Sequence, residues 1–354
     1  MVATITKCSA QPAEGKLFNG LAPRNLSILI VTAMYPHAGH EGEGAFVMHQ
    51  VEQLRAFQHQ VDVLHFRGYS SKCEYLKAAF EVRRRTRGGR YDVVHAHYGV
   101  TGLPALFRCD APLVVTLHGS DALCGWVEPA VSRLVCRLAD GTVVVSKGIA
   151  DKIPGEVIPC GVDLRSFKPK GRELARERLG LSLEKLYVLF PFNPGRRIKR
   201  YDLASGAVNA LSKAGVNVEL LTVSKVPNSE MPWYYSAANA MILCSDSEAS
   251  PTSVKEALAC NLPVVSTEVG DVKDIVEGIA GVYLCSQNIE ALAKGLRMAL
   301  APPDGFVFDG RKAMERYDQE AVTEAIVRVY RRAIENRRLS RLSGSRVGPG
   351  LGMR

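Results

Sequence analysis

The sequence predicts an α/β protein built from two doubly wound parallel-sheet domains that face each other across a cleft. Three observations indicate this fold class. The chain has 354 residues, which is long for one average domain. Short apolar, β-branched runs alternate with amphipathic helical patterns, as in parallel sheets covered by helices on both faces. The alternation forms two series, separated near residues 161–169, where the strand rhythm stops and proline appears.

Six apolar runs of strand length make up the first series, with helical patterns between them. The expected strands are residues 26–34, 61–66, 91–97, 113–118, 142–146 and 157–160. The expected helices are residues 45–58, 101–107 and 129–139. Residues 1–24 lack hydrophobic periodicity, so we expect a disordered segment there and a first domain over residues 25–165.

The second series repeats the pattern and is expected to form a second domain over residues 166–318. Its expected strands are residues 187–192, 216–223, 240–244, 263–267 and 282–285. Its expected helices are residues 201–213, 252–259, 271–277 and 289–300. A final helical pattern follows, and we expect residues 319–337 to pack back on the first domain. Residues 338–354 then read as a basic, disordered tail.

The formal net charge of +9 is concentrated at the C-terminus. Residues 337–354 hold five arginines and no acidic residue, and this segment contains no aromatic residue. Nucleic acid is therefore not expected as a partner. A second basic run comprises Arg83, Arg84, Arg85, Arg87 and Arg90. It indicates either a solvated helix end or a patch that meets an anionic membrane or acceptor.

Cysteine usage and hydropathy favour a cytoplasmic protein. The nine cysteines include no Cys-x-x-Cys pair, and several lie inside apolar runs, which fits a reducing compartment. No apolar stretch approaches the roughly 20 residues that cross a bilayer. The first 25 residues lack the apolar core of a signal peptide.

The most informative segment is the run from Glu248 to Glu256. It follows an apolar strand pattern, passes a polar turn, and opens a helix near Pro251 and Thr252. A carboxylate, free helix N-terminal amides and a second carboxylate therefore meet at the carboxyl end of a strand. Together such groups can hold a sugar, a phosphate and a ribose.

Four cations follow the first strand of the second series. Arg196, Arg197, Lys199 and Arg200 lie between this strand and the helix that follows. Arginine binds phosphate oxygens bidentately and lysine supplies a point charge, so the cluster suits a diphosphate. The alternative is a basic solvated loop.

Three further motifs end strands of the first series. Gly42 and Gly44 precede a helix, which suits either an anion-binding loop or a plain tight turn. His118 begins the motif His-Gly-Ser-Asp, which ends at Asp121 and is placed to face the cleft, although a lone histidine is often structural. A histidine pair at residues 95 and 97 shares one strand face, but its spacing suggests no third ligand, so no metal site is expected.

In their order and spacing, these motifs resemble those of retaining glycosyltransferases of family 4, which have the GT-B fold. The resemblance covers about residues 26–337 and includes the motifs at 42–44, 95–98, 116–121, 145–147, 157–163, 167–169, 196–199 and 248–265. Three departures stand out: Ala249 occupies a position that is often glycine, the first glycine loop reads Gly-Glu-Gly instead of Gly-Gly, and Lys199 comes only three positions after Arg196. That spacing leaves Arg197 or Arg200 as an alternative diphosphate ligand.

The resemblance implies a role for each candidate residue. Arg196 and Lys199 would bind the diphosphate, with Gly44 approaching it from the first domain. Glu248 would hold hydroxyl groups of the donor sugar, and Glu256 would hold the ribose. The full implied donor-binding set is Gly44, Arg196, Lys199, Glu248, Ser250, Pro251, Thr252 and Glu256, and the implied catalytic set is His118, Arg196, Lys199 and Glu248.

The resemblance also implies the reaction. A hexose-type sugar would pass from a nucleotide-diphosphate sugar, most commonly a UDP-sugar, to a saccharide or glycolipid hydroxyl, with retention of configuration and without a metal or other cofactor. The leaving phosphate would take the acceptor's proton. A small natural-product aglycone is the main alternative acceptor. A phosphorylase, a sugar-nucleotide epimerase or a non-catalytic carbohydrate-binding subunit are alternative functions.

Residues 68–90 and 122–130 are expected to form variable walls of the acceptor site in the first domain. Tyr69, Tyr75 and Trp126 could stack on a sugar ring or serve in packing. We expect a cytoplasmic location, with peripheral contact at the inner face of an anionic membrane as an open alternative.

Overall fold

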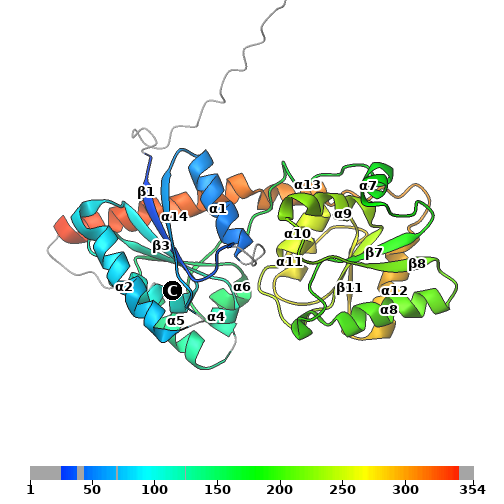
Figure 1. Cartoon of the computed structure of the whole chain (residues 1–354), viewed down its shortest axis with the longest axis horizontal. Helices are drawn as coiled ribbons and strands as arrows, with labels where there is room; N and C mark the ends of the chain where they lie inside the picture. The colour runs from blue at the N-terminus through cyan, green and yellow to red at the C-terminus, as the bar shows by residue number, and fades with distance from the viewer. Residues whose placement is uncertain (1–24, 38–43, 69–70, 124, 343–354) are drawn as a thin grey trace, which may run out of the picture.

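Two parallel β-sheets organise the chain, which we describe from a computed structural model over residues 25–37, 44–68, 71–123 and 125–342. The predicted pair of doubly wound domains is confirmed (Figure 1). Gly42, Tyr69 and most of the two expected disordered ends lie outside the described residues.

The first sheet has six strands in the order β2-β1-β3-β4-β5-β6, and the described neighbours pair in parallel. Its strands are β1 (Ser27–Thr32), β2 (Gln60–His65), β3 (Val93–His97), β4 (Leu113–Leu117), β5 (Gly141–Val144) and β6 (Glu156–Val157). The apolar runs of β1, β3 and β4 are buried on both faces because helices cover both sides.

Helices cover the two faces of this sheet in two layers. One layer contains α2 (Lys72–Thr86), α3 (Gly99–Ala105) and α5 (Val127–Leu138), and the short α4 (Ser120–Leu123) lies beside α5. The other contains α1 (Ala45–Ala56) and the C-terminal helix α14 (Gln319–Leu342). Alternate strand residues, such as Leu29 and Ile28, contact the two layers in turn. The short η1 (Arg87–Gly89) follows α2, and α6 (Lys147–Ala150) follows β5.

The second sheet has five parallel strands in the order β11-β10-β9-β7-β8. They are β7 (Leu186–Phe190), β8 (Val218–Thr222), β9 (Ala240–Leu243), β10 (Val264–Thr267) and β11 (Tyr283–Cys285). One face packs against α9 (Met231–Ala237), α10 (Thr252–Ala259), α11 (Val272–Val276) and α13 (Arg311–Met314). The other packs against α8 (Tyr201–Lys213) and α12 (Ile289–Leu300). The remaining elements are α7 (Arg172–Leu179), which packs on α9, and the short turns η2 (Arg197–Lys199), η3 (Asn228–Glu230) and η4 (Glu315–Tyr317).

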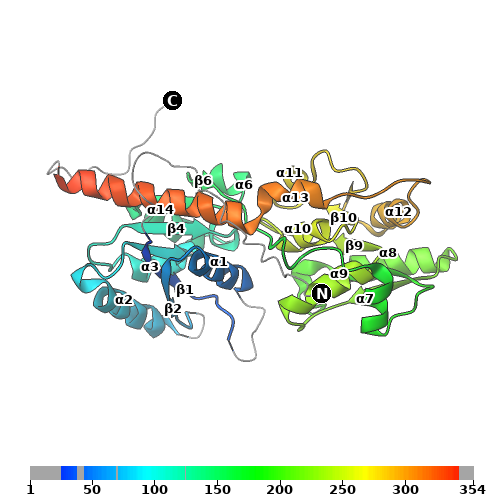
Figure 2. The ribbon, with the colours of Figure 1, turned by 90° about the horizontal axis from the view of Figure 1, so that it is seen from above.

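The chain returns to the first domain at its C-terminal end. The amide of Gln319 donates to the carbonyl of Val162 at 3.0 Å, and α14 then runs along the first domain (Figure 2). Its residues Ile326 and Tyr330 belong to the apolar core beneath β1 and β3. The helix continues to Leu342, so residues 338–342, which we expected in a disordered tail, are helical. Arg341 anchors this last turn because its guanidinium donates to Asp110 Oδ1 at 2.9 Å.

Three of the longer helices and one strand differ from the expected pattern. Helices α2, α7 and α9 were not expected as such, because each buries few apolar residues and carries little periodic signal; α2 buries only Ala78, Ala79, Val82 and Thr86. Strand β6 is shorter than expected, since its pairing with β5 ends at Val157, after which the chain leaves for the second domain.

Candidate active site

The candidate residues follow strands at the two points where strand order reverses. In the first sheet the order reverses between β1 and β3, and in the second between β7 and β9. Gly44 follows β1, whereas Lys199 follows β7 and Glu248 follows β9. Ligands of open α/β sheets bind at the carboxyl ends of strands at such points. In each sheet, the topology therefore brings the predicted residues to the carboxyl edge, at the point where the strand order reverses.

The domains touch near these strand ends. Lys147 forms an ion pair with Asp274 at 3.3 Å, and Asn228 lies 3.4 Å from His49. Gly119 of the first domain approaches Ala249 so closely that a Cβ on Gly119 would lie 2.4 Å from the Ala249 Cβ. Gly119 also has a φ of 118°, so both the close approach and the backbone conformation require glycine at this position.

The segment from Glu248 to Ala249 is held from its other side by Gly270. A Cβ on Gly270 would lie 2.7 Å from the Ala249 carbonyl oxygen and 2.8 Å from that of Glu248. Ala249 does not have a positive φ, so this chain does not need the glycine that is often found at that position.

Lys199 and Glu248 form an ion pair within the second domain. Lys199 Nζ contacts Glu248 Oε1, and Ser245 Oγ donates to the same oxygen at 2.7 Å. The side chains are only 9% and 15% exposed, respectively, so each charge depends on the other for compensation. Lys199 Nζ also lies 4.3 Å from the centre of the Phe192 ring.

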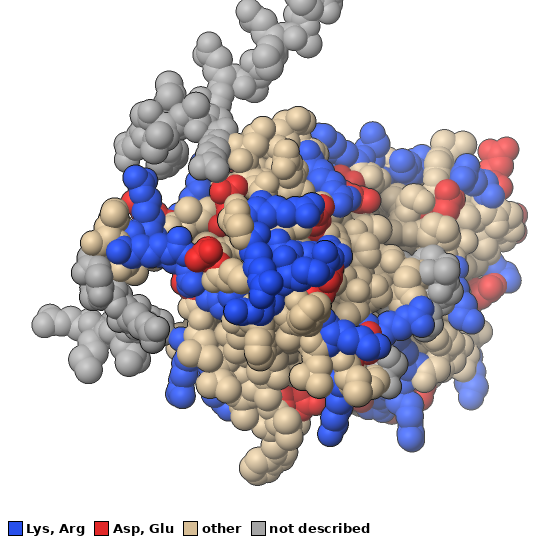
Figure 3. Space-filling view, turned by 60° about the vertical axis from the view of Figure 1, so that its left-hand side comes forward, with Lys and Arg blue, Asp and Glu red and all other residues tan. Residues whose placement is uncertain are grey.

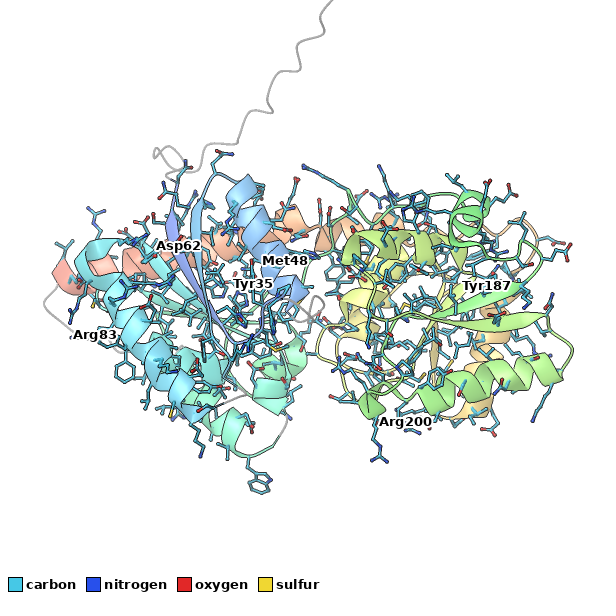
Figure 4. The ribbon with its side chains drawn as sticks, viewed as in Figure 1. Tyr35, Met48, Asp62, Arg83, Tyr187 and Arg200 are labelled. Atoms are coloured by element: carbon cyan, nitrogen blue, oxygen red, sulfur yellow. The ribbon has the colours of Figure 1, made fainter. Side chains whose placement is uncertain are left out.

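The three neighbouring arginines have different environments. Arg200 is bound by Asp202 and Asp246, through contacts of 2.8 and 3.1 Å, near the start of α8 (Figure 4). Arg197 borders an open hollow of about 580 Å³ together with Arg200. Arg196 is exposed, and within the described ranges its side chain has no hydrogen-bond or ion-pair partner. Arg196 and Arg197 are thus both exposed and available to a ligand beside Lys199, whereas Arg200 is held by two aspartates.

Helix α10 begins at Thr252 with Pro251 as its N-cap and without a side-chain cap. Its first amide groups therefore remain available to an anion. The hydroxyl of Ser250 accepts a hydrogen bond from Lys255 Nζ at 2.7 Å, so this side chain is engaged inside the protein. Lys255 is fully buried and also donates to the Cys160 carbonyl at 2.8 Å.

Glu256 lies one turn after Thr252 on the same side of α10. Tyr235 donates a hydrogen bond of 2.8 Å to Glu256 Oε2. Burial raises the pKa of Glu256 to about 7, although hydrogen bonds from Tyr235 and Thr252 oppose the shift. The carboxyl group thus changes charge near neutral pH.

His118 follows β4 and packs among aromatic rings. Its Nε2 lies 3.0 Å from His97 Nδ1, and its ring centre lies 4.6 Å from that of Phe46 and 4.8 Å from that of Tyr98. Burial lowers the pKa of His97 to about 3 and that of His118 well below its usual value. Both rings are therefore neutral at pH 7.

Two residues of the first-domain motifs have internal partners. Asp121 is buried and accepts hydrogen bonds from the amides of Gly99 and Gly119 at 3.0 and 2.8 Å. The prediction that Asp121 faces the cleft is therefore wrong, because its carboxylate holds the loop. His95 lies within 2.7 Å of both Thr116 and Tyr330, which links β3 to α14. Within the described ranges, no group of three or more His, Cys, Asp or Glu residues is arranged to hold a metal ion.

Gly44 caps α1 with a φ of 67°. A Cβ there would lie 2.3 Å from the Met34 carbonyl oxygen, so the close approach to the end of β1 requires glycine. Tyr75 packs edge-on against Phe66 with ring centres 5.1 Å apart, whereas Trp126 is almost fully exposed.

The sequence reasoning missed Tyr235, Lys255 and Ser245 as supporting residues. Lys255 lies inside the run from Glu248 to Glu256, and its place in an otherwise apolar helical pattern is a signal that could have indicated it. No sequence signal connects Tyr235 to Glu256, because the contact joins two separate helices, α9 and α10, that pack on one face of the second sheet.

Comparison with known proteins matches both halves of the chain to glycosyltransferase families. Residues 16–166 match the family described as Glycosyltransferase Family 4, and residues 207–321 match Glycosyl transferases group 1. The sucrose-phosphate synthase of Thermosynechococcus elongatus superposes with a TM-score of 0.73 at 20% identity, covering 88% of this chain and 100% of that one.

Curated relatives are similar over most of the chain. The putative teichuronic acid biosynthesis glycosyltransferase TuaC of Bacillus subtilis is 25% identical, covering 77% of this chain and 88% of the relative. The D-inositol 3-phosphate glycosyltransferase of Mycobacterium tuberculosis is 27% identical, covering 74% of this chain and 66% of the relative.

The two sheets, with their reversal points and the matched families, define a GT-B transferase that uses a nucleotide-sugar donor. The chain belongs to the glycosyltransferases of the family 4 type. None of the helices in the described parts of the chain is long and apolar enough to cross a bilayer.

Proposed function

We propose that this enzyme transfers a hexose-type sugar from a UDP-sugar to a hydroxyl group of a saccharide or glycolipid, with retention of anomeric configuration. The observation that carries the proposal is the grouping of Lys199, Glu248 and the uncapped start of α10 at one strand-order reversal. A cation, a carboxylate and free amides at one point suit a sugar joined to a diphosphate.

Each donor group has a proposed partner. Arg196 and Lys199 bind the diphosphate, aided by the backbone of Ser250 to Thr252, and Gly44 approaches it from the first domain. Glu248 accepts hydrogen bonds from the donor sugar, and Glu256 accepts them from the ribose. Lys199 and Glu248 form an ion pair, so the proposed ligands of the diphosphate and of the donor sugar lie side by side.

The proposed chemistry places the developing charge where this chain has cations. As the bond between the anomeric carbon and the diphosphate oxygen breaks, negative charge grows on the phosphate, and Arg196, Lys199 and the α10 amides stabilise it without a metal ion. The acceptor oxygen attacks the same face, and its proton passes to the leaving phosphate. The internal bonding of Asp121 supports this scheme, since that carboxylate is not directed at the sugar as a nucleophile.

A saccharide acceptor is supported by the Bacillus subtilis relative, whose name refers to teichuronic acid biosynthesis. A small polyol phosphate is a second candidate, since the mycobacterial relative is named for D-inositol 3-phosphate. We place the enzyme in the cytoplasm, at the inner face of the membrane. Domain limits at residues 25–165 and 166–318, with residues 319–337 returning to the first domain, are part of this proposal.

A donor screen tests the proposed function. Purified protein is incubated with individual UDP-, GDP- and ADP-sugars, with and without EDTA, and nucleotide release is followed by mass spectrometry. We expect slow hydrolysis of UDP-sugars that EDTA does not abolish. When a saccharide acceptor is added, the new glycosidic bond read by NMR should have the anomeric configuration of the donor. A preference for another nucleotide, or neither binding nor release with all donors, would contradict the proposal.

A further inference from the structure

One helix layer of the first domain exposes large apolar side chains on its outer side. Helices α2 and α5 both pack on α3 and share its apolar cluster, so their opposite sides point away from the domain. Leu76 and Phe80 of α2 are 73% and 71% exposed, and Trp126, next to α5, is 94% exposed. We call this surface the α2–α5 face; its exposed apolar residues are Leu76, Phe80, Phe107, Trp126, Val127, Leu134 and Leu138.

The exposed residues follow helical spacing. Leu76 and Phe80 are four positions apart, and Leu134 and Leu138 repeat that spacing on α5, so each pair lies on one side of its helix. Single exposed apolar residues are ordinary on a protein surface, but several gathered on the two helices that flank α3 mark an interaction site.

Basic side chains accompany this apolar set. Arg83, Arg84 and Arg85 form the last turn of α2, and Glu81 pairs with Arg84 and Arg85 at 2.7 and 2.6 Å, so these three arginines and one glutamate keep a formal charge of +2. The exposed Arg133 and Arg137 directly precede Leu134 and Leu138. Figure 3, in which the first-domain end comes forward, shows Lys and Arg side chains gathered there, and Figure 4 places Arg83 at the outer edge of the first domain. A surface with this mixture of large apolar and cationic side chains is complementary to anionic lipid head groups and the acyl boundary beneath them.

The face also has a suitable position relative to the cleft. Helix α2 follows β2, and Trp126 follows the short α4, which begins just after His118. Because parallel strands end on the same edge, the starts of α2 and α5 lie near the edge that carries the candidate site (Figure 1). A membrane against the α2–α5 face would therefore lie beside the cleft entrance.

We propose that the α2–α5 face docks onto an anionic membrane surface, inserting Leu76, Phe80 and Trp126 while the arginines of α2 and α5 contact lipid head groups. This inference rests on the proposed function and extends it, because a membrane at this surface would present a lipid-linked saccharide to the cleft. Vesicle binding itself requires neither donor nor acceptor, so its outcome is separable from that of the donor screen.

Trp126 allows a direct test in the full chain. The two tryptophans are Trp126 and Trp233, and in the Trp233→Phe variant the fluorescence reports on Trp126 alone. We expect a blue shift with vesicles that contain phosphatidylglycerol and quenching by brominated lipid, but little change with pure phosphatidylcholine. An unchanged spectrum with both vesicle types would overturn the proposal.

Flotation with the same vesicles identifies the surface. The double substitution Leu76→Ser and Phe80→Ser should weaken binding ~10-fold or more, since it removes two inserted side chains. The matched control, Leu174→Ser and Leu183→Ser, changes two exposed leucines of the second domain and should bind like the parent. Equal binding by both variants would contradict this face. The proposal would also be contradicted if the parent protein did not bind vesicles but formed a dimer that the Leu76→Ser and Phe80→Ser double substitution abolished. A second copy of the chain would then be the occupant of this face.

Discussion

Lys199 and Glu248 form an ion pair that joins the loop after β7 to the loop after β9. The strands are neighbours in the second sheet, so the pair depends on β7 and β9 being adjacent. It holds two charged side chains in place and makes the two residues energetically dependent on each other.

Substituting Lys199 by alanine should lower turnover ~10- to 100-fold or more, from the loss of a charged hydrogen bond worth about 1.5–3 kcal/mol. It should also lower the free energy of unfolding, because Glu248 would lose its ion-pair partner in a nearly buried place. A urea titration of Lys199→Ala, Glu248→Gln and the double variant measures the coupling. Strictly additive losses of stability would show that the pair contributes nothing as a pair.

Arg196→Ala and Arg200→Ala should affect different properties of the enzyme, turnover in the first case and stability in the second. Arg196 has no side-chain partner in the described ranges, so its removal should lower turnover ~10- to 100-fold and leave stability unchanged. Arg200 is held by Asp202 and Asp246, so its removal should affect stability more than turnover. Steady-state kinetics and thermal unfolding of both variants, with Arg197→Ala as a third, measure this. Normal turnover in Arg196→Ala combined with loss in Arg197→Ala would reassign the diphosphate ligand.

Nucleotide affinity should depend on pH through Glu256. Its pKa is raised from 4.5 to about 7 by burial, so the group is largely protonated in the folded protein between these values. The stability from this protonated state is fully present below pH 4.5 and is lost as the pH rises through about 7. Only the carboxylate accepts hydrogen bonds from both ribose hydroxyls, so UDP affinity should rise with pH over the same range.

Calorimetric titration of UDP at several pH values checks this dependence. The Glu256→Gln variant should bind UDP more weakly. Its affinity for UDP should vary with pH only as far as the titration of the UDP phosphate itself requires. Tyr235→Phe should move the midpoint to higher pH, because the Tyr235 hydroxyl lowers the pKa of Glu256. Identical pH profiles for Glu256→Gln and the parent would rule out Glu256 as the titrating ligand.

Gly119→Ala should impair the approach of the two domains. The added Cβ would lie 2.4 Å from the Ala249 Cβ, and the φ of 118° adds strain of about 1–3 kcal/mol. We expect a ~10-fold or larger loss in kcat/KM, since misplacing the facing groups is costly. Ala249→Gly in the same chain should restore part of the loss by removing the clash. Gly148→Ala, which meets no atom within 4 Å, is the matched control.

Much of the fold was predictable because parallel strands buried on both faces read as continuous apolar runs, as in β1 and β4. Helix α2 was not, since its many charges conceal a short buried stripe. At the candidate site, the sequence indicated which residues follow strand ends. The orientation of each side chain needed coordinates: Asp121 binds backbone amides, and Arg200 binds two aspartates, although both belong to motifs that suggested ligand contact.

The C-terminal helix contributes Ile326, Val327, Val329, Tyr330 and Ala333 to the core beneath the first sheet. During synthesis, the strands of that sheet therefore leave the ribosome long before the side chains that complete one of their faces. The second domain can fold first as a unit, while the first waits with an uncovered apolar surface for the last part of the chain. A chain that stops before residue 319 would lose part of the first domain's core, even though its missing residues come after the second domain in the sequence.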